Sequence, residues 1–235
     1  MNGVSCIYRD EHIIILDKEA GVASTRLEGS SLPTVEDWLM QNIPSVAANG
    51  GGLVNRLDNL TSGLIVAAFT ADDLFEMRAL WKKREVEKEY ICLVIGSAPP
   101  EGRITTLIAH HPTRSNKMIV VKDLEEAKLL KARAAETEFW VLEDMFEYTL
   151  LRVRIYGGVR HQVRVHLSSI GFPIAGDELY KKEKHKRRDW LGLSRHFLHA
   201  SRISFVSPFD GKRLEFDSPL PRDLEEALAK AKGMK

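Results

Sequence analysis

The stretch that most constrains the fold runs from Val54 to Thr70, where a polar turn leads directly into the apolar run Leu64–Phe69. Such a run, bounded by turn residues, is typical of a buried strand. Arg56 and Asp58 flank Leu57, so in an extended segment their side chains point to the same side. The stretch therefore predicts a carboxylate at the mouth of a buried sheet, where its charge can be tuned for catalysis. A turn cap at Asp58 beside a solvated Arg56 is the simpler alternative.

Hydrophobic periodicity along the chain predicts more strands than helices, which favours an α+β fold over a doubly wound sheet. Strands are expected at Val4–Tyr8, Ile13–Leu16, Leu64–Phe69, Lys88–Ile95, Ile104–Ala109, Lys117–Val121, Ala134–Leu142, Tyr148–Tyr156, Arg202–Val206 and Arg213–Phe216. The first two are β-branched runs on either side of a polar stretch and predict a hairpin. Helices are expected between Pro33 and Pro44 and over Ala71–Lys83, Arg160–Ile170 and Pro221–Lys232, with Asp123–Arg133 irregular or helical. The glycine-rich stretch Ala47–Gly52 predicts a bent or mobile loop ahead of Asp58.

Composition sets the outer limits on function. The 235 residues, 44% of them hydrophobic and 29% charged, fit one large domain or two small ones. No apolar run approaches the roughly 18 residues that a membrane span needs, and we expect a cytoplasmic protein. Cys6 and Cys92 exclude a disulfide framework and a four-cysteine zinc site, and both are expected to be buried. The net charge of +1 gives no argument for nucleic acid, so any such role depends on where the charges lie.

Adjacent histidines at His110 and His111 raise the question of a metal site. Neighbouring residues on a strand point to opposite faces, and no third ligand lies at a useful spacing. We therefore expect no metal.

Four segments, in order, resemble motifs of the RluA-type pseudouridine synthases. Val54–Thr70 resembles the pattern HRLDxxTSGLLLFAK, and Glu87–Gly96 resembles KxYxAxVxG. Gly158–Leu167 resembles GRTHQIRVHL and continues into Gly171–Asp177, and Leu198–Ala200 resembles the late LHA pattern. The resemblance runs from about Val4 to Pro208 and implies the pseudouridine synthase fold, a mixed, mainly antiparallel central sheet flanked by helices and loops.

The resemblance also implies roles for three residues. Asp58 matches the family's catalytic aspartate, although its attack on the sugar, its attack on the base and its removal of a sugar proton all stay open. Arg164 matches an arginine that would lower the pKa of Asp58 and fix its rotamer, whereas the simpler alternative is a surface helix charge. Tyr90 matches a tyrosine that stacks on the base, whereas the alternative is an ordinary strand aromatic.

Further residues are predicted to contact RNA. A stacked uridine must be extruded before it can react, and Arg56 resembles the residue that fills the vacated space, although it could instead contact phosphate. Two departures from the family pattern, Asn55 in place of His and Val159 in place of Arg, are interpreted as altered RNA contacts. The remaining candidates are Arg160, His161 and Gln162 and, within the basic run Lys181–Arg188, Lys182, Lys184, Lys186 and Arg187.

The resulting hypothesis is a single pseudouridine synthase catalytic domain over residues 1–235, with no separate N-terminal RNA-binding module. It would isomerise uridine in structured RNA, ribosomal or transfer, as a monomer that needs no metal and no small-molecule cofactor. Two other classes of protein compete with this hypothesis. A binding protein or RNA chaperone that kept the fold and lost catalysis is disfavoured by the intact Asp58, and a carboxylate-dependent hydrolase by the lack of a second acid in a recognisable motif.

Overall fold

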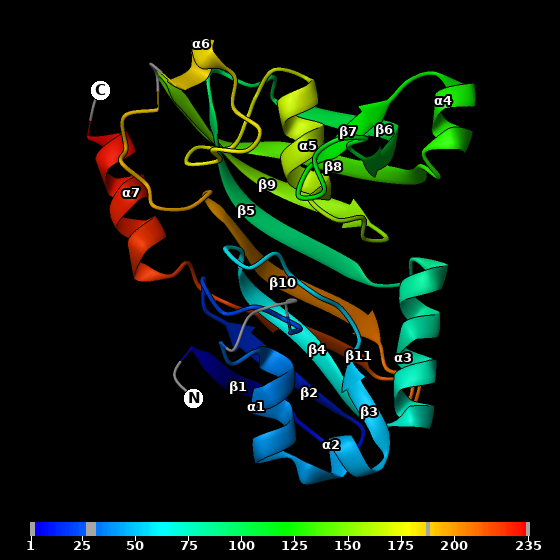
Figure 1. The fold of residues 1–235 in the computed structure, drawn as a ribbon. Helices are drawn as coiled ribbons and strands as arrows, with labels where there is room; N and C mark the ends of the chain where they lie inside the picture. The colour runs from blue at the N-terminus through cyan, green and yellow to red at the C-terminus, as the bar shows by residue number, and fades with distance from the viewer. Residues whose placement is uncertain (1–2, 27–31, 187–188, 234–235) are drawn as a thin grey trace. The chain divides into compact units, whose positions relative to one another are not determined.

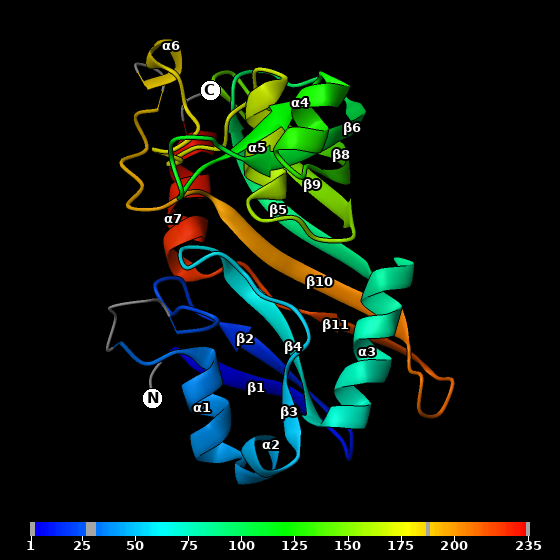
Figure 2. The same cartoon turned by 45° about the vertical axis from the view of Figure 1, so that its right-hand side comes forward.

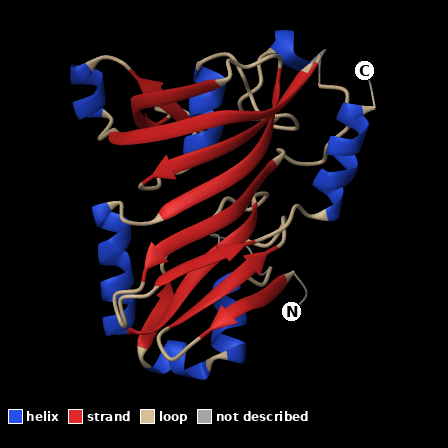
Figure 3. Cartoon of the chain, turned by 180° about the vertical axis from the view of Figure 1, so that it is seen from behind, coloured by secondary structure: helices blue, strands red, loops and turns tan. Residues whose placement is uncertain are grey.

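The computed structural model describes residues 3–26, 32–186 and 189–233 (Figure 1). They group into two compact units. The first unit contains residues 1–88 and 199–221, and the second contains residues 89–198 and 222–235. Figure 3 shows that strands make up most of the regular structure in each unit. Among the helices of the described ranges, none is long and apolar enough to cross a bilayer.

A mixed sheet forms the centre of the first unit. Its strands are β1 (Val4–Arg9), β2 (Ile13–Lys18), β3 (Gly50–Leu53), β4 (Ser62–Thr70), β10 (Leu198–Val206) and β11 (Arg213–Asp217). Strand β4 pairs antiparallel with β2 and β3 and parallel with β10, while β1 and β11 extend the sheet antiparallel to β2 and β10. The predicted strands Val4–Tyr8, Ile13–Leu16 and Leu64–Phe69 are therefore confirmed, and the first two form the expected hairpin.

Helices α1 (Val35–Asn42), α2 (Pro44–Ala48) and α3 (Ala71–Lys83) accompany this sheet (Figure 2). Helix α3 has the predicted bounds because Thr70 and Asp73 cap each other reciprocally at its first turn. Its Met77 is fully buried in a core cluster with Ile13 and Leu64 of the sheet. This packing fixes α3 against strands β2 and β4.

The prediction of a loop at Ala47–Gly52 is wrong, because α2 and β3 occupy this stretch. Pro44 is the first residue of α2, which suits a residue without a backbone N–H. The glycines of β3 allow a close backbone approach, since a Cβ at Gly51 would lie 2.4 Å from the carbonyl oxygen of Ala68 in β4. Glycine here marks tight strand packing and not a mobile loop.

The second unit is also built on β-sheet, and its strand pairs are largely antiparallel. Its strands run in the order β5 (Glu87–Ile95), β9 (Tyr148–Tyr156), β8 (Arg133–Met145), β6 (Glu101–His110) and β7 (Met118–Val121). The accompanying helices are α4 (Leu124–Leu129), α5 (Gln162–Ser169), α6 (Glu183–Lys186) and α7 (Arg222–Lys232). Helix α5 packs Val165 against Ile108, Met118 and Ala135 of this sheet.

Two details of the prediction are wrong. The helix predicted over Arg160–Ile170 is shorter, because α5 covers Gln162–Ser169; Ile170 follows as its C-cap and is 40% exposed. Cys6 is exposed on the outermost strand β1, whereas Cys92 is buried as expected. Burial raises the pKa of the Cys92 thiol, so this cysteine is an inert part of the core.

Candidate active-site residues

The segment between β3 and β4 carries Asp58. Leu57 is buried, Arg56 is exposed and Asp58 is half-buried, so the chain alternates as the sequence predicted. The hydroxyl of Ser24 accepts from Leu57 N at 3.0 Å and donates to Leu57 O at 2.9 Å, and Thr61 N donates to Asp58 O at 3.0 Å. One side chain thus holds both backbone groups next to Asp58, and a turn closes directly after it.

Lys18 provides a second anchor for this segment. It is fully buried, and its ammonium group donates to the carbonyl oxygens of Glu19, Val22 and Asn59 at 2.9, 2.8 and 3.0 Å. Gly21 N also donates to Asn59 O at 2.9 Å. A buried charge needs such partners. The ammonium therefore ties the residue after Asp58 to the end of β2.

Ser62 and Gly63, at the start of β4, hold this strand against β10. A Cβ at Gly63, where φ is +112°, would lie 2.2 Å from Ala200 O in β10. His199 Nε2 donates to Ser218 O at 3.1 Å, so its Nδ1 accepts from the Ser62 hydroxyl at 3.0 Å in the neutral ring. The late Leu198–Ala200 motif thus serves to lock β4 and β10 together.

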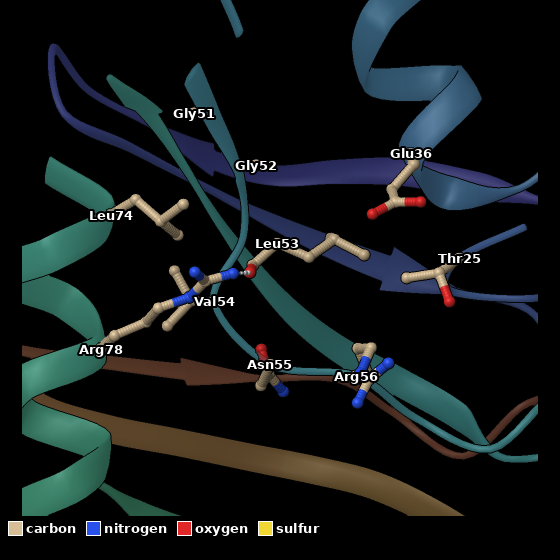
Figure 4. Close-up of a pocket in the computed structure, with 10 residues that line it drawn as sticks. All are labelled: Thr25, Glu36, Gly51, Gly52, Leu53, Val54, Asn55, Arg56, Leu74 and Arg78. Atoms are coloured by element: carbon tan, nitrogen blue, oxygen red, sulfur yellow. Dashed lines mark hydrogen bonds between the residues drawn. The ribbon is translucent and has the colours of Figure 1, made fainter. Parts of the chain in front are cut away.

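Asn55 was predicted to contact RNA and has a structural use in this molecule. Its Oδ1 accepts a hydrogen bond from the backbone N–H of Val66 in β4 at 2.8 Å, so the side chain pairs with this strand. Arg56, the next residue, lies exposed at the edge of a surface pocket (Figure 4). We therefore retain Arg56 as a proposed RNA contact and propose that Asn55 mainly fixes its backbone.

In the second unit, Arg164 on α5 is buried and forms a two-point ion pair. Its Nε and Nη2 donate to Asp177 Oδ2 and Oδ1 at 2.7 and 2.9 Å. Burial alone would raise the pKa of Asp177, but the hydrogen bonds and charge of Arg164 outweigh burial and lower it. Arg164 is therefore not a solvated helix charge, and Asp177 holds its guanidinium in one orientation.

Tyr180 contacts four residues at this ion pair. The Arg164 guanidinium lies over its ring at 5.1 Å and the Lys117 ammonium at 5.4 Å. Its hydroxyl accepts from Met118 N at 2.8 Å and is hydrogen-bonded to His161 Nδ1 at 2.8 Å. Arg164 is thus fixed by an aromatic face as well as by a carboxylate.

His161 and Gln162, which precede Arg164, form the start of α5. His161 adopts the left-handed conformation, with φ of 56°, and precedes α5 as its N-cap. Gln162 is buried; its Nε2 donates to Glu136 O at 2.7 Å and Thr137 Oγ1 at 3.1 Å, and its Oε1 accepts from Val159 N at 3.1 Å. We therefore propose that Gln162 affects RNA only indirectly, by fixing the start of α5.

The other predicted residues have different surroundings. Tyr90 lies in β5 and is only 8% exposed. Its neighbour Glu89 accepts from Arg154 Nη2 at 2.6 Å. Arg160, Lys182 and Lys184 are exposed, as RNA contacts must be. Lys186 lies in α6, but its side chain and the whole of Arg187 fall outside the described residues.

Sequence reasoning missed Lys18, Ser24, Asp177 and Tyr180. Asp177 ends one segment of the motif comparison, but no spacing rule connects it to Arg164, and Lys18 lies outside all of these segments. Ser24 contacts a residue 33 positions away. Only the folded chain brings these groups together.

Comparison with known proteins agrees with this fold. One similar solved structure is human RNA Pseudouridylate Synthase Domain Containing 1, with a TM-score of 0.74 and 22% sequence identity. The match covers 99% of this chain and 95% of the human chain. A second human structure, of the domain containing 4 protein, gives a TM-score of 0.75 at 21% identity, with 97% and 93% coverage. The fold is therefore that of the pseudouridine synthases.

Sequence comparison identifies the family. The RNA pseudouridylate synthase family matches residues 12–169, more than half of the chain. Ribosomal large subunit pseudouridine synthase D of Nitrosomonas europaea is 33% identical over 94% of this chain and 63% of its own length. An uncharacterized RNA pseudouridine synthase of Chloroflexus aurantiacus is 36% identical over 90% and 64%. The chain belongs to the RNA pseudouridylate synthase family and spans somewhat less than two thirds of these two relatives.

Proposed function

We propose that this protein isomerises uridine to pseudouridine at a specific position in structured RNA, with Asp58 as the catalytic carboxylate. The observation that carries the proposal is the family match together with the anchoring of Asp58 by Ser24 and Lys18. A carboxylate on a rigid segment, half-buried beside the apolar strand β4, is positioned before substrate arrives. The anchors thus supply the preorganisation that catalysis requires.

The proposed reaction is balanced without a cofactor. The N1–C1′ bond of uridine breaks, the base turns, and C5 joins C1′; C5 loses a proton and N1 takes one up. We propose that Arg164 acts as the fixed positive group and Tyr90 as the platform for the base, on the resemblance of their motifs. The Asp177 carboxylate and the Tyr180 ring would keep the Arg164 guanidinium from rotating during this sequence.

Ribosomal RNA is the substrate class that we favour over transfer RNA. The support is the printed name of the relative from Nitrosomonas europaea, which refers to the large ribosomal subunit. Exposed cations of the second unit, Arg160, Lys182 and Lys184, are proposed to bind phosphates. Action in the cytoplasm, as a monomer, stays a prediction.

The test is release of tritium from RNA labelled at uridine C5, measured for the wild type and for Asp58→Asn. Asn is nearly isosteric and removes the charge, so we expect a folded protein that binds RNA and releases no tritium. Filter binding reports RNA affinity, and a melting curve reports the fold.

Three outcomes contradict parts of the proposal. A wild type that binds RNA and never releases tritium is a binding protein or chaperone. An Asp58→Asn variant that loses thermal stability along with activity indicates a structural role for Asp58. Full tritium release by Asp58→Asn removes the carboxylate from the chemistry.

A further inference from the structure

A pocket of about 400 Å³ lies within the first unit, next to Arg56. Figure 4 shows β3 in its middle, with Glu36 of α1 on one side and Leu74 and Arg78 of α3 on the other. Its size falls in the range of pockets that hold small ligands, roughly 300–1,000 Å³. Apart from Arg56 and Asn55, none of its lining residues has a role in the reaction proposed above.

Part of the pocket lining is bare backbone and aliphatic side chain. Gly51 and Gly52 present bare backbone, and a Cβ at Gly52 would meet nothing within 4 Å, which indicates open space over the strand. Val54 and Leu74 add aliphatic surface on the α3 side (Figure 4). A floor without side chains, next to aliphatic walls, suits the face of a planar ring.

Its polar part combines cations with one carboxylate. Arg78 Nη2 donates to Leu53 O at 3.1 Å, which orients its guanidinium, and the exposed Arg56 lines the pocket on the other side of Asn55 (Figure 4). Glu36 lies across β3 from Arg78 (Figure 4). A phosphate would be attracted by both arginines but repelled by Glu36. A ligand with acceptors on one edge and N–H donors on another satisfies all three groups.

Guanine is the RNA base with this pattern. Its O6 and N7 match the arginine fork, and its N1–H and N2 amino group can donate to a carboxylate, which only accepts. We propose that the pocket holds an unstacked guanine of the RNA substrate, distinct from the isomerised uridine, with Arg78 on O6 and N7 and Glu36 on the N1 and N2 donors. This inference rests on the proposed function, because unpaired RNA bases are read at these edges.

Nucleotide binding tests the inference without any turnover. Wild-type protein is titrated with guanosine monophosphate, adenosine monophosphate and inorganic phosphate while the backbone amide signals of Gly51 and Gly52 are followed by NMR. We expect saturable shifts with guanosine monophosphate, much weaker binding of adenosine monophosphate and no shift with phosphate. Equal binding of the two nucleotides, or the same shifts with phosphate alone, would overturn the guanine assignment.

A matched pair of variants locates the contact. Glu36→Gln should weaken guanosine monophosphate binding by about 5- to 140-fold, the effect of one good base contact. Glu11→Gln makes the same charge change at an exposed position in the turn between β1 and β2 and should leave binding unchanged. Equal effects of the two variants would show that Glu36 acts only through net charge.

Kinetics with RNA separate this inference from the proposed function. Glu36→Gln should raise the KM for RNA and leave kcat for C5 tritium release unchanged. If wild type releases no tritium, the proposed function fails, whereas the nucleotide titration still judges the pocket. If wild type is active but guanosine monophosphate does not bind, the pocket inference alone fails.

Discussion

Replacing Asp177 by Asn should destabilise the protein strongly, because Arg164 would keep its buried charge and lose its carboxylate. The side chains of Arg164 and Asp177 are only 9% and 1% exposed, so water cannot replace the lost partner. Removing one member of a buried ion pair costs about 3–5 kcal/mol. Asn keeps one acceptor oxygen, which places the expected loss near the lower end, about 3 kcal/mol. Urea unfolding followed by tryptophan fluorescence measures it.

Asp217→Asn is the matched control, since Asp217 also accepts two bonds from an arginine, Arg202, but its side chain is 65% exposed. An exposed pair contributes at most about 1 kcal/mol.

The pH at which the two variants are compared matters, because the pKa of Asp177 lies below its ordinary value of 3.8. The stabilisation by Asp177 is therefore present at neutral pH and is lost as pH falls through the lowered pKa. Equal losses for Asp177→Asn and Asp217→Asn at pH 7 would refute the argument.

Three more predictions concern other features. His166 is fully buried between Thr106 and Thr137, and burial lowers its pKa from 6.5 to about 4. As pH falls, the unfolded chain therefore binds a proton at this histidine before the folded chain does. Between pH 6.5 and 4 the wild type should lose up to about 3 kcal/mol of its free energy of unfolding, a loss that His166→Gln should not show. Parallel pH profiles of urea midpoints would contradict this. Gly63→Ala should lower the free energy of unfolding, measured by calorimetry, by more than about 3 kcal/mol, because the new Cβ meets the Ala200 backbone. Gly211→Ala, also at positive φ but in open space, should lower it by about 1–2 kcal/mol. Equal losses would exclude the steric explanation. Replacing Lys182 and Lys184 by Gln should reduce the slope of log K against log salt for RNA binding by about 1–2, and an unchanged slope would make them solvated charges only.

Local patterns in the sequence were enough to predict much of the fold. The bounds of α3 followed from its periodicity, and the hairpin of β1 and β2 followed from two β-branched runs around a polar turn. Gly51 was misread because glycine permits both a loop and a close approach of two strands, and only the position of Ala68 decides between them.

The surroundings of the candidate residues could not be predicted in the same way. Lys18 contacts a carbonyl 41 positions away, and Arg164 contacts a carboxylate 13 positions away. Such contacts depend on how distant segments pack, and no spacing within one element indicates them. The sequence therefore indicated which residues to examine, whereas the structure shows what holds Arg164 and the Asp58 segment in place.

The most direct test of the central claim is a pseudouridine map of cellular RNA from the host organism with and without this protein. We predict that a specific uridine in structured RNA, most directly in the large ribosomal RNA, loses its modification when the protein is absent. Wild-type protein should restore the modification, and Asp58→Asn, expressed at the same level, should not. Identical maps with and without the protein would contradict the assignment as an RNA uridine isomerase.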